Sequence, residues 1–303
     1  MTIAIAWTRG VSPHEELVFV TDSRLSGDGN TFDACPKVQM LPRPDCAIAF
    51  AGVTGHAYPM MQQLSLAIES HRPLKDSSLD LPIVRSHALK IFSSMAKTIE
   101  SQQKPEDPTN AYPGAEFLFG GYAWEKKKFE LWRIFFDPSI NGFAAHPALW
   151  AGFDVRAKAA RLRQANTRLK PFGLIAFAGD QAPVARERFK ELLTSRDEED
   201  ANAPLNWEPL EIVRDMLRDS EKAHTIGGPP QIMKVHQYPS TEPLGVWWQQ
   251  GGERKMFLQG RECLGYERTE RFVIDPDTLM TSAPFLSINA SGVSETRNAI
   301  LSE

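Results

Sequence analysis

Four residues near the start of the chain have the types and the order that amide-bond cleavage by an N-terminal threonine requires. They are Thr2, Asp22, Lys37 and Gly52. A threonine at the N-terminus carries nucleophile and base together, because its hydroxyl attacks while its own α-amine takes the proton. The reaction also needs a cation that lowers the pKa of this amine, a carboxylate that holds the cation, and a backbone N–H that binds the oxyanion. Thr2 has a free amine only after Met1 is removed.

Four short strands are expected between residues 2 and 53, and they would bring these positions together. The stretches TIAIAWT, LVFVTDSRL, KVQML and CAIAFAGV are rich in apolar and β-branched residues and are separated by turn residues. Asp22 lies near the end of the second stretch, Lys37 opens the third, and Gly52 lies at the turn after the fourth. Because neighbouring strands of this kind pair antiparallel, a single cluster is expected.

The rest of the chain alternates between groups of helices and groups of strands. Helical spacing of apolar residues appears in AYPMMQQLSLAIESH, after the entry DLP, and in APVARERFKELLTS and EPLEIVRDMLRDSEKAH. Strands are expected in AEFLFGGYAW, FELWRIFFD, GFAAHPALWAG, LIAFAGD and PPQIMKVHQ, followed by a hairpin in GVWWQQGGERKMFLQG. The basic segment DVRAKAARLRQANTRLK is expected to be a helix with a solvated face, the alternatives being a binding patch or a subunit contact. This order predicts an α+β fold with helices outside the strand sheets.

Composition restricts the class of protein further. The chain has 303 residues, 42% hydrophobic and 24% charged, as in ordinary globular proteins. A net charge of −4 argues against nucleic-acid binding. Neither an apolar run of membrane-spanning length nor a signal peptide is expected. The three cysteines (Cys35, Cys46 and Cys263) lack metal or redox spacing, which favours a reducing cytoplasm. We therefore expect a cytoplasmic protein without metal or cofactor that binds neither nucleic acid nor membrane.

Three short motifs carry a resemblance to a known family. They are TDSR at residues 21–24, PKV at residues 36–38, and FAGVTGH at residues 50–56. With a threonine at the mature N-terminus, these motifs resemble those of proteasome β-subunits and their bacterial HslV-type relatives, which are N-terminal-nucleophile (Ntn) hydrolases. The resemblance implies that Thr2 is the nucleophile after Met1 is removed and that Asp22 orients Lys37. It also implies that the Gly52 N–H donates to the oxyanion.

The resemblance covers residues 2–237 and weakens toward its end. The family's Gly-Ser-Gly turn, whose serine supports the terminal amine, corresponds to Gly179-Asp180-Gln181, so a carboxylate replaces the serine. Asp180 either contacts the Thr2 amine or caps the helix that begins at Ala182. The family's late Asp-x-x-Ser-Gly-Gly motif corresponds to residues 223–228, where neither the aspartate nor the serine is present.

The resemblance also implies an architecture and a division of the chain. It implies a four-layer αββα sandwich in which two sheets are covered by helices. Residues 1–240 would form the proteasome-like Ntn-hydrolase domain, and residues 241–303 a C-terminal hairpin extension and tail.

The implied activity is that of a threonine-type peptidase acting on peptides or unfolded proteins. Such peptidases work in ring assemblies, which implies a homo-oligomer and an ATP-dependent unfoldase as partner. Lys37→Ala is expected to abolish hydrolysis and to leave the fold largely intact. The alternative is a catalytically inactive, proteasome-like scaffold or interaction subunit. Residues next to the motifs are expected to contact substrate, namely Arg24, Leu25, Ser26, Phe50 and Thr54.

Overall fold

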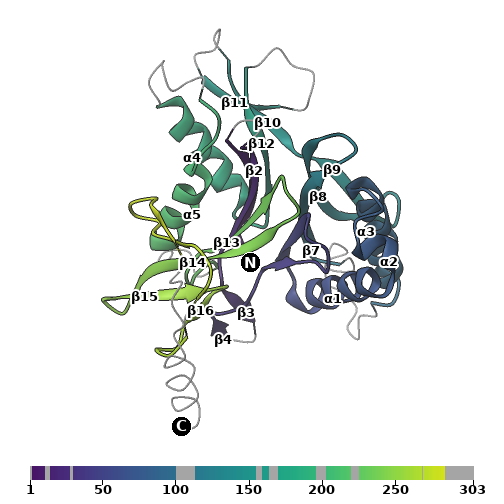
Figure 1. Cartoon of the computed structure of the whole chain (residues 1–303), viewed down its shortest axis with the longest axis horizontal. Helices are drawn as coiled ribbons and strands as arrows, with labels where there is room; N and C mark the ends of the chain where they lie inside the picture. The colour runs from purple at the N-terminus through teal and green to yellow at the C-terminus, as the bar shows by residue number, and fades with distance from the viewer. Residues whose placement is uncertain are drawn as a thin grey trace.

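The computed structural model describes residues 2–10, 14–27, 30–99, 113–154, 159–163, 170–195, 203–219, 225–267 and 269–283. Over these residues the chain is an α+β protein with antiparallel sheets and five helices (Figure 1). None of the helices in these ranges is long and apolar enough to cross a membrane. The expected C-terminal tail, from Ser287 onward, lies outside the described residues.

The larger sheet has eleven strands and is built around the N-terminal hairpin. Strands β1 and β2 pair antiparallel with Ala4 opposite Thr21, and both are almost wholly buried. The main path runs β11-β10-β12-β1-β2-β13-β14-β15-β16, and β17 pairs parallel with β14 and antiparallel with β18. The strands are β1 (Ala4–Arg9), β2 (Glu16–Thr21), β10 (Leu149–Asp154), β11 (Ala159–Arg163), β12 (Lys170–Ala178), β13 (Gln231–His236), β14 (Thr241–Gln250), β15 (Glu253–Leu258), β16 (Arg261–Glu262), β17 (Val273–Ile274) and β18 (Thr281–Ser282).

The second sheet has five strands that follow one another in sequence order. These strands are β5 (Val38–Met40), β6 (Cys46–Gly52), β7 (Ala115–Ala123), β8 (Lys128–Asp137) and β9 (Gly142–Pro147). Two further short strands, β3 (Leu25–Gly27) and β4 (Asn30–Phe32), form a separate hairpin.

Helices cover one face of each sheet, and the other faces meet in a shared apolar cluster. Helices α1 (Thr54–Ser70), α2 (Arg72–Lys75) and α3 (Leu81–Ala96) pack against the five-stranded sheet, whereas α4 (Ala182–Thr194) and α5 (Glu208–Arg218) pack against the larger sheet (Figure 1). Side chains alternate across a strand. Ile5 of β1 therefore joins the cluster under α4 and α5, while Ala4 and Ala6 join the cluster between the sheets.

The basic segment does not form the expected helix where the structure describes it. Ala159–Arg163 is strand β11, paired antiparallel with β10, and the remaining residues 155–158 and 164–169 lie outside the described residues. Alanine and arginine favour helices, but this preference is worth only fractions of a kcal/mol per residue. Pairing with β10 and packing of Leu162 on the apolar cluster outweigh it. The expected strand GFAAHPALWAG also divides, because β9 and β10 belong to different sheets.

The chain beyond residue 240 continues the larger sheet. Strand β14 pairs with β13, with Ile232 opposite Leu244, and forms a hairpin with β15. The Gly-Gly turn expected from the sequence is observed, since Gly251 and Gly252 have φ values of 61° and 84° and connect the two strands. Both glycines adopt the positive φ that a tight hairpin turn requires.

Candidate active site

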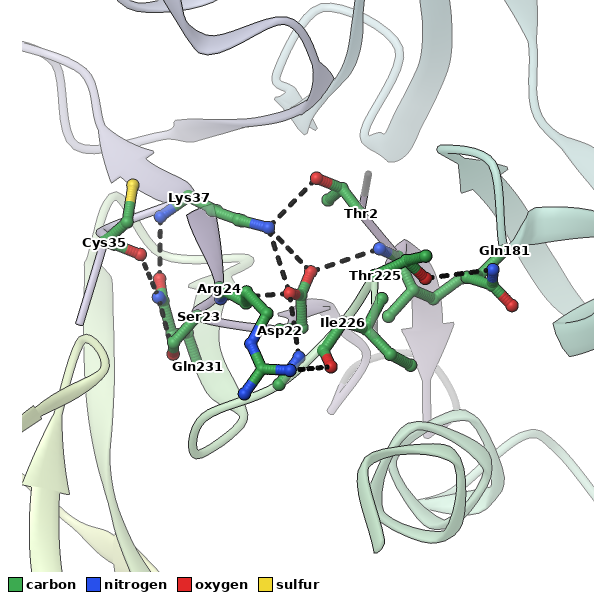
Figure 2. A network of polar contacts seen from close by, with 12 residues as sticks. Thr2, Asp22, Ser23, Arg24, Cys35, Lys37, Gln181, Thr225, Ile226 and Gln231 are labelled. Carbon is green, nitrogen blue, oxygen red and sulfur yellow. Dashed lines mark hydrogen bonds and ion pairs between the residues drawn. The ribbon is translucent and has the colours of Figure 1, made fainter. Parts of the chain in front are cut away.

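Thr2, Asp22 and Lys37 meet where the N-terminal hairpin faces the second sheet. The register of β1 and β2 places Ile3, directly before β1, beside Asp22, directly after β2, so Thr2 lies one residue further along. Lys37 directly precedes β5. The Lys37 Nζ donates to Thr2 Oγ1 at 2.9 Å and to Asp22 Oδ1 and Oδ2 at 2.9 and 3.0 Å (Figure 2). The lysine therefore contacts both the hydroxyl and the carboxylate, in the arrangement expected from their order.

The Asp22 carboxylate accepts hydrogen bonds on both oxygens. Backbone N–H groups of Ile3, Arg24 and Gly227 donate to it at 3.1, 3.0 and 3.4 Å, in addition to the Lys37 ammonium. Burial raises the pKa of the Asp22 carboxyl, while the Lys37 charge and the N–H donors act in the opposite direction. Because every partner is a donor, the geometry suits the ionised form.

Lys37 is completely buried, unlike the solvated lysine that is the default at the start of a strand. Its backbone N–H donates to Gln231 Oε1 at 2.8 Å, and Gln231 Nε2 donates to Ser23 Oγ at 2.9 Å and to the Cys35 carbonyl (Figure 2). The Gln231 side chain thus connects the backbone of residues 35–37 with the hydroxyl of Ser23, the residue after Asp22. The sequence offered no signal for this residue, because it lies 194 positions from Lys37.

Asp180 faces Thr2 and does not cap the following helix. The Thr2 backbone N–H donates to Asp180 Oδ1 at 2.6 Å. Helix α4 has Gln181 as its N-cap and no side-chain cap hydrogen bond, so the capping interpretation of Asp180 is wrong. The preceding Gly179 has φ +100°, and a Cβ there would lie 2.0 Å from the Thr2 carbonyl oxygen. This position therefore requires glycine, which lets the turn approach the Thr2 backbone closely.

A cleft of about 810 Å³ opens beside the cluster. Thr2, Gly52 and Asp180 line it. Gly52 has φ +96°, and a Cβ there would lie 2.0 Å from the Gly114 carbonyl oxygen, so this wall also depends on a glycine. Other lining residues are Arg24, Leu25, Ser26, Thr54, Glu116, Phe135 and Phe136.

Of the five residues expected to contact substrate, four line the cleft and one lies in the core. Arg24, Leu25, Ser26 and Thr54 line the cleft. Phe50 does not, because it is fully buried in the cluster under α1–α3 with its ring 5.2 Å from that of Tyr58. Its side chain points to the helix side of β6, a consequence of strand alternation that places its neighbours Ala49 and Ala51 between the sheets.

Residues 225–228, which we call the late loop, contact the site. In the sequence they correspond to the end of the expected Asp-x-x-Ser-Gly-Gly motif. The Gly227 N–H donates to Asp22. Thr225 Oγ1 accepts from Gln181 Nε2 at 3.1 Å (Figure 2). The Arg24 guanidinium pairs with Asp33 at 2.7 Å and donates to the Ile226 carbonyl at 3.2 Å, which ties this loop to the cleft. Residues 220–224 lie outside the described residues.

Comparisons with known proteins add no family assignment. No protein-family model matches the chain, and no significant match is found among curated proteins. Among the described residues, no group of three or more His, Cys, Asp or Glu side chains could hold a metal ion. The chain is therefore an α+β protein with a buried threonine–lysine–aspartate cluster at a cleft.

Proposed function

We propose that this protein is an N-terminal threonine hydrolase that cleaves amide bonds. The observation that carries the proposal is the Lys37 ammonium, which bonds both Thr2 Oγ1 and the Asp22 carboxylate at the edge of the cleft. A buried lysine is costly to desolvate, and bonding it to a hydroxyl and a carboxylate is an arrangement that suits nucleophilic catalysis.

The proposed reaction proceeds through an acyl-enzyme. After Met1 is removed, the Thr2 amine takes the proton of Oγ1 as this oxygen attacks the substrate carbonyl carbon. Lys37 stabilises the developing charge, and the Gly52 N–H binds the oxyanion. The tetrahedral intermediate collapses as the C–N bond breaks, and the proton passes from the Thr2 ammonium to the leaving amine. Water then attacks the ester, the amine again takes the proton, and the acid is released with Oγ1 protonated.

We further propose that the layers are those of the four-layer αββα sandwich of proteasome-like Ntn hydrolases. The support is the order of the apolar clusters, with one between the sheets and one under the helices on each outer face. On this proposal the substrates are peptides or unfolded proteins, cleaved by a homo-oligomer supplied by an ATP-dependent unfoldase.

The state of the N-terminus tests the proposal directly. Protein made without an N-terminal tag is expected to have an intact mass lower by one methionine residue. A peptide epoxyketone, which reacts with the hydroxyl and the free amine together, should then label Thr2 once per chain. Thr2→Ser is the matched variant that retains both groups and should still be labelled. Retention of Met1 would refute the active form, since no free threonine amine would exist.

The inactive scaffold is the second candidate, and two observations favour it. The late loop has neither the aspartate nor the serine of the family motif, and Thr2 is only 2% exposed. A processed N-terminus without labelling or turnover on any peptide would favour the scaffold.

Replacing Asp180 by serine is expected to move the acidic limb of the kcat/KM profile to lower pH. A carboxylate at 2.6 Å favours the ammonium form of the Thr2 amine and raises its pKa, and a protonated amine cannot act as base. Removing the charge lowers this pKa, so the base is available at lower pH. Peptide cleavage across a pH series measures the shift, and Asp219→Ser, at an exposed carboxylate after α5, is the control. An unmoved limb would show that Asp180 does not act on the amine.

A further inference from the structure

A small cavity near the cleft is lined by three basic side chains. It has a volume of about 110 Å³ and is bordered by Arg133 of β8, His146 of β9 and Arg186 of α4. The backbone segments 147–149 and 175–177 complete its wall. We call this cavity the anion pocket.

The topology explains how residues from separate layers reach the anion pocket. Arg133 and His146 are register partners on β8 and β9. Leu131, two residues before Arg133 on β8, belongs to the cluster between the sheets, so Arg133 lies on the same face. Strand β12 is paired with β10 only as far as Ile175, although it continues to Ala178. Its edge is uncovered beyond that point, which lets Arg186 line the same cavity from α4.

The charges in the anion pocket do not balance. Arg133 pairs with Glu116 through Nη2 at 2.6 Å and Nε at 3.1 Å. The buried Nε of Arg186 has no hydrogen-bond partner within the described ranges. Burial lowers the pKa of Arg186 and the nearby Arg133 charge adds to this effect, whereas the Glu116 charge, which is already paired with Arg133, opposes it. The two arginines and one glutamate leave a positive charge and an unmet donor.

We propose that the anion pocket binds a phosphate group. Its volume equals that of three to four waters at about 30 Å³ each, which suits a compact oxyanion of a few heavy atoms. Guanidinium groups match phosphate oxygens in geometry and remain charged when partly buried. A phosphate would accept from Arg186 Nε, compensate the excess charge, and contact Arg133 and His146 from the opposite wall.

Glu116 connects the anion pocket with the active-site cleft. It lines the cleft, pairs with Arg133, and accepts from the Gly179 N–H at 3.4 Å. A phosphate in the anion pocket competes with Glu116 for Arg133. Glu116→Gln is therefore expected to raise phosphate affinity several-fold, because it removes the competing charge and leaves both arginines in place.

The test is titration calorimetry of the full chain with inorganic phosphate at constant ionic strength, with chloride as the balancing anion. Wild type is expected to bind, and Arg186→Gln to bind on the order of tenfold or more weakly, as the loss of a charged hydrogen bond implies. Arg188→Gln is the matched control, since it removes the same charge on α4 but from a side chain paired with Asp219 at the surface. It should retain the affinity of wild type.

Two further titrations, with O-phosphoserine and with acetate, identify the ligand. O-phosphoserine binding alongside phosphate would identify a phosphate group carried on a larger molecule, whereas binding of phosphate alone would identify the free ion. Acetate binding as tight as phosphate binding would overturn phosphate as the ligand. The proposal also fails if wild type shows no binding above the chloride control or if Arg186→Gln binds like wild type. The readout is binding, so the result does not depend on hydrolase activity.

Discussion

Replacing Lys37 by methionine is expected to reduce kcat/KM for peptide hydrolysis by on the order of 10²–10³ or more. Lys37 donates to Thr2 Oγ1 at 2.9 Å, so its positive charge lies directly beside the oxygen proposed to attack. Methionine keeps the length and the apolar stem but removes the charge. The loss therefore reports the electrostatic role of the ammonium group.

Lys37→Met is also expected to destabilise the fold, whereas the sequence alone led us to expect a largely intact fold for Lys37→Ala. Lys37 and Asp22 are both completely buried. Removing one partner of a buried ion pair leaves an uncompensated charge and costs about 3–5 kcal/mol. Urea unfolding measures this loss, and peptide cleavage below the unfolding transition measures the catalytic effect separately.

The control for Lys37 is Lys75→Met on α2, where the side chain is half exposed. It should change neither activity nor stability appreciably, since exposed ion pairs contribute about 0–1 kcal/mol. A folded Lys37→Met protein that cleaves peptides at the wild-type rate would show that Lys37 has no catalytic role.

Asp22→Ala is expected to lower the free energy of unfolding by about 3–5 kcal/mol, because the Lys37 ammonium would be buried without a counter-ion. Backbone N–H groups of Ile3 and Arg24 would also lose their acceptor. Peptide hydrolysis should also fall in Asp22→Ala, because Asp22 would no longer hold Lys37 against Thr2. Asp219→Ala, at an exposed carboxylate after α5, is the control for stability and should unfold at nearly the same urea concentration as wild type.

A double variant separates the structural from the catalytic contribution of the pair. Lys37→Met with Asp22→Ala removes both charges, so its loss of stability should be smaller than the sum of the losses of the two single variants. It should remain inactive, because no cation contacts Oγ1. If the stability losses of the two single variants simply add, the buried pair is not coupled as the 2.9 Å contact indicates.

The sequence by itself determined the N-terminal hairpin, the later helices and the three central residues of the site. Alternation and β-branched residues predicted β1, β2 and β6, and apolar spacing predicted α3, α4 and α5. These signals are local, because each depends on residues within one element. Thr2, Asp22 and Lys37 could be grouped since they lie at the ends of strands that follow one another closely.

Tertiary structure alone decided which side chains reach the site and how far they are buried. Phe50 lies in the core and not in the cleft, because strand alternation in a sheet with two covered faces turns it toward the helices. Strand β11 forms where helix propensity was strong, since pairing with β10 outweighs it. Gln231 and the anion pocket come from segments distant in sequence. Burial and long-range pairing depend on the whole packed chain, so no local pattern encodes them.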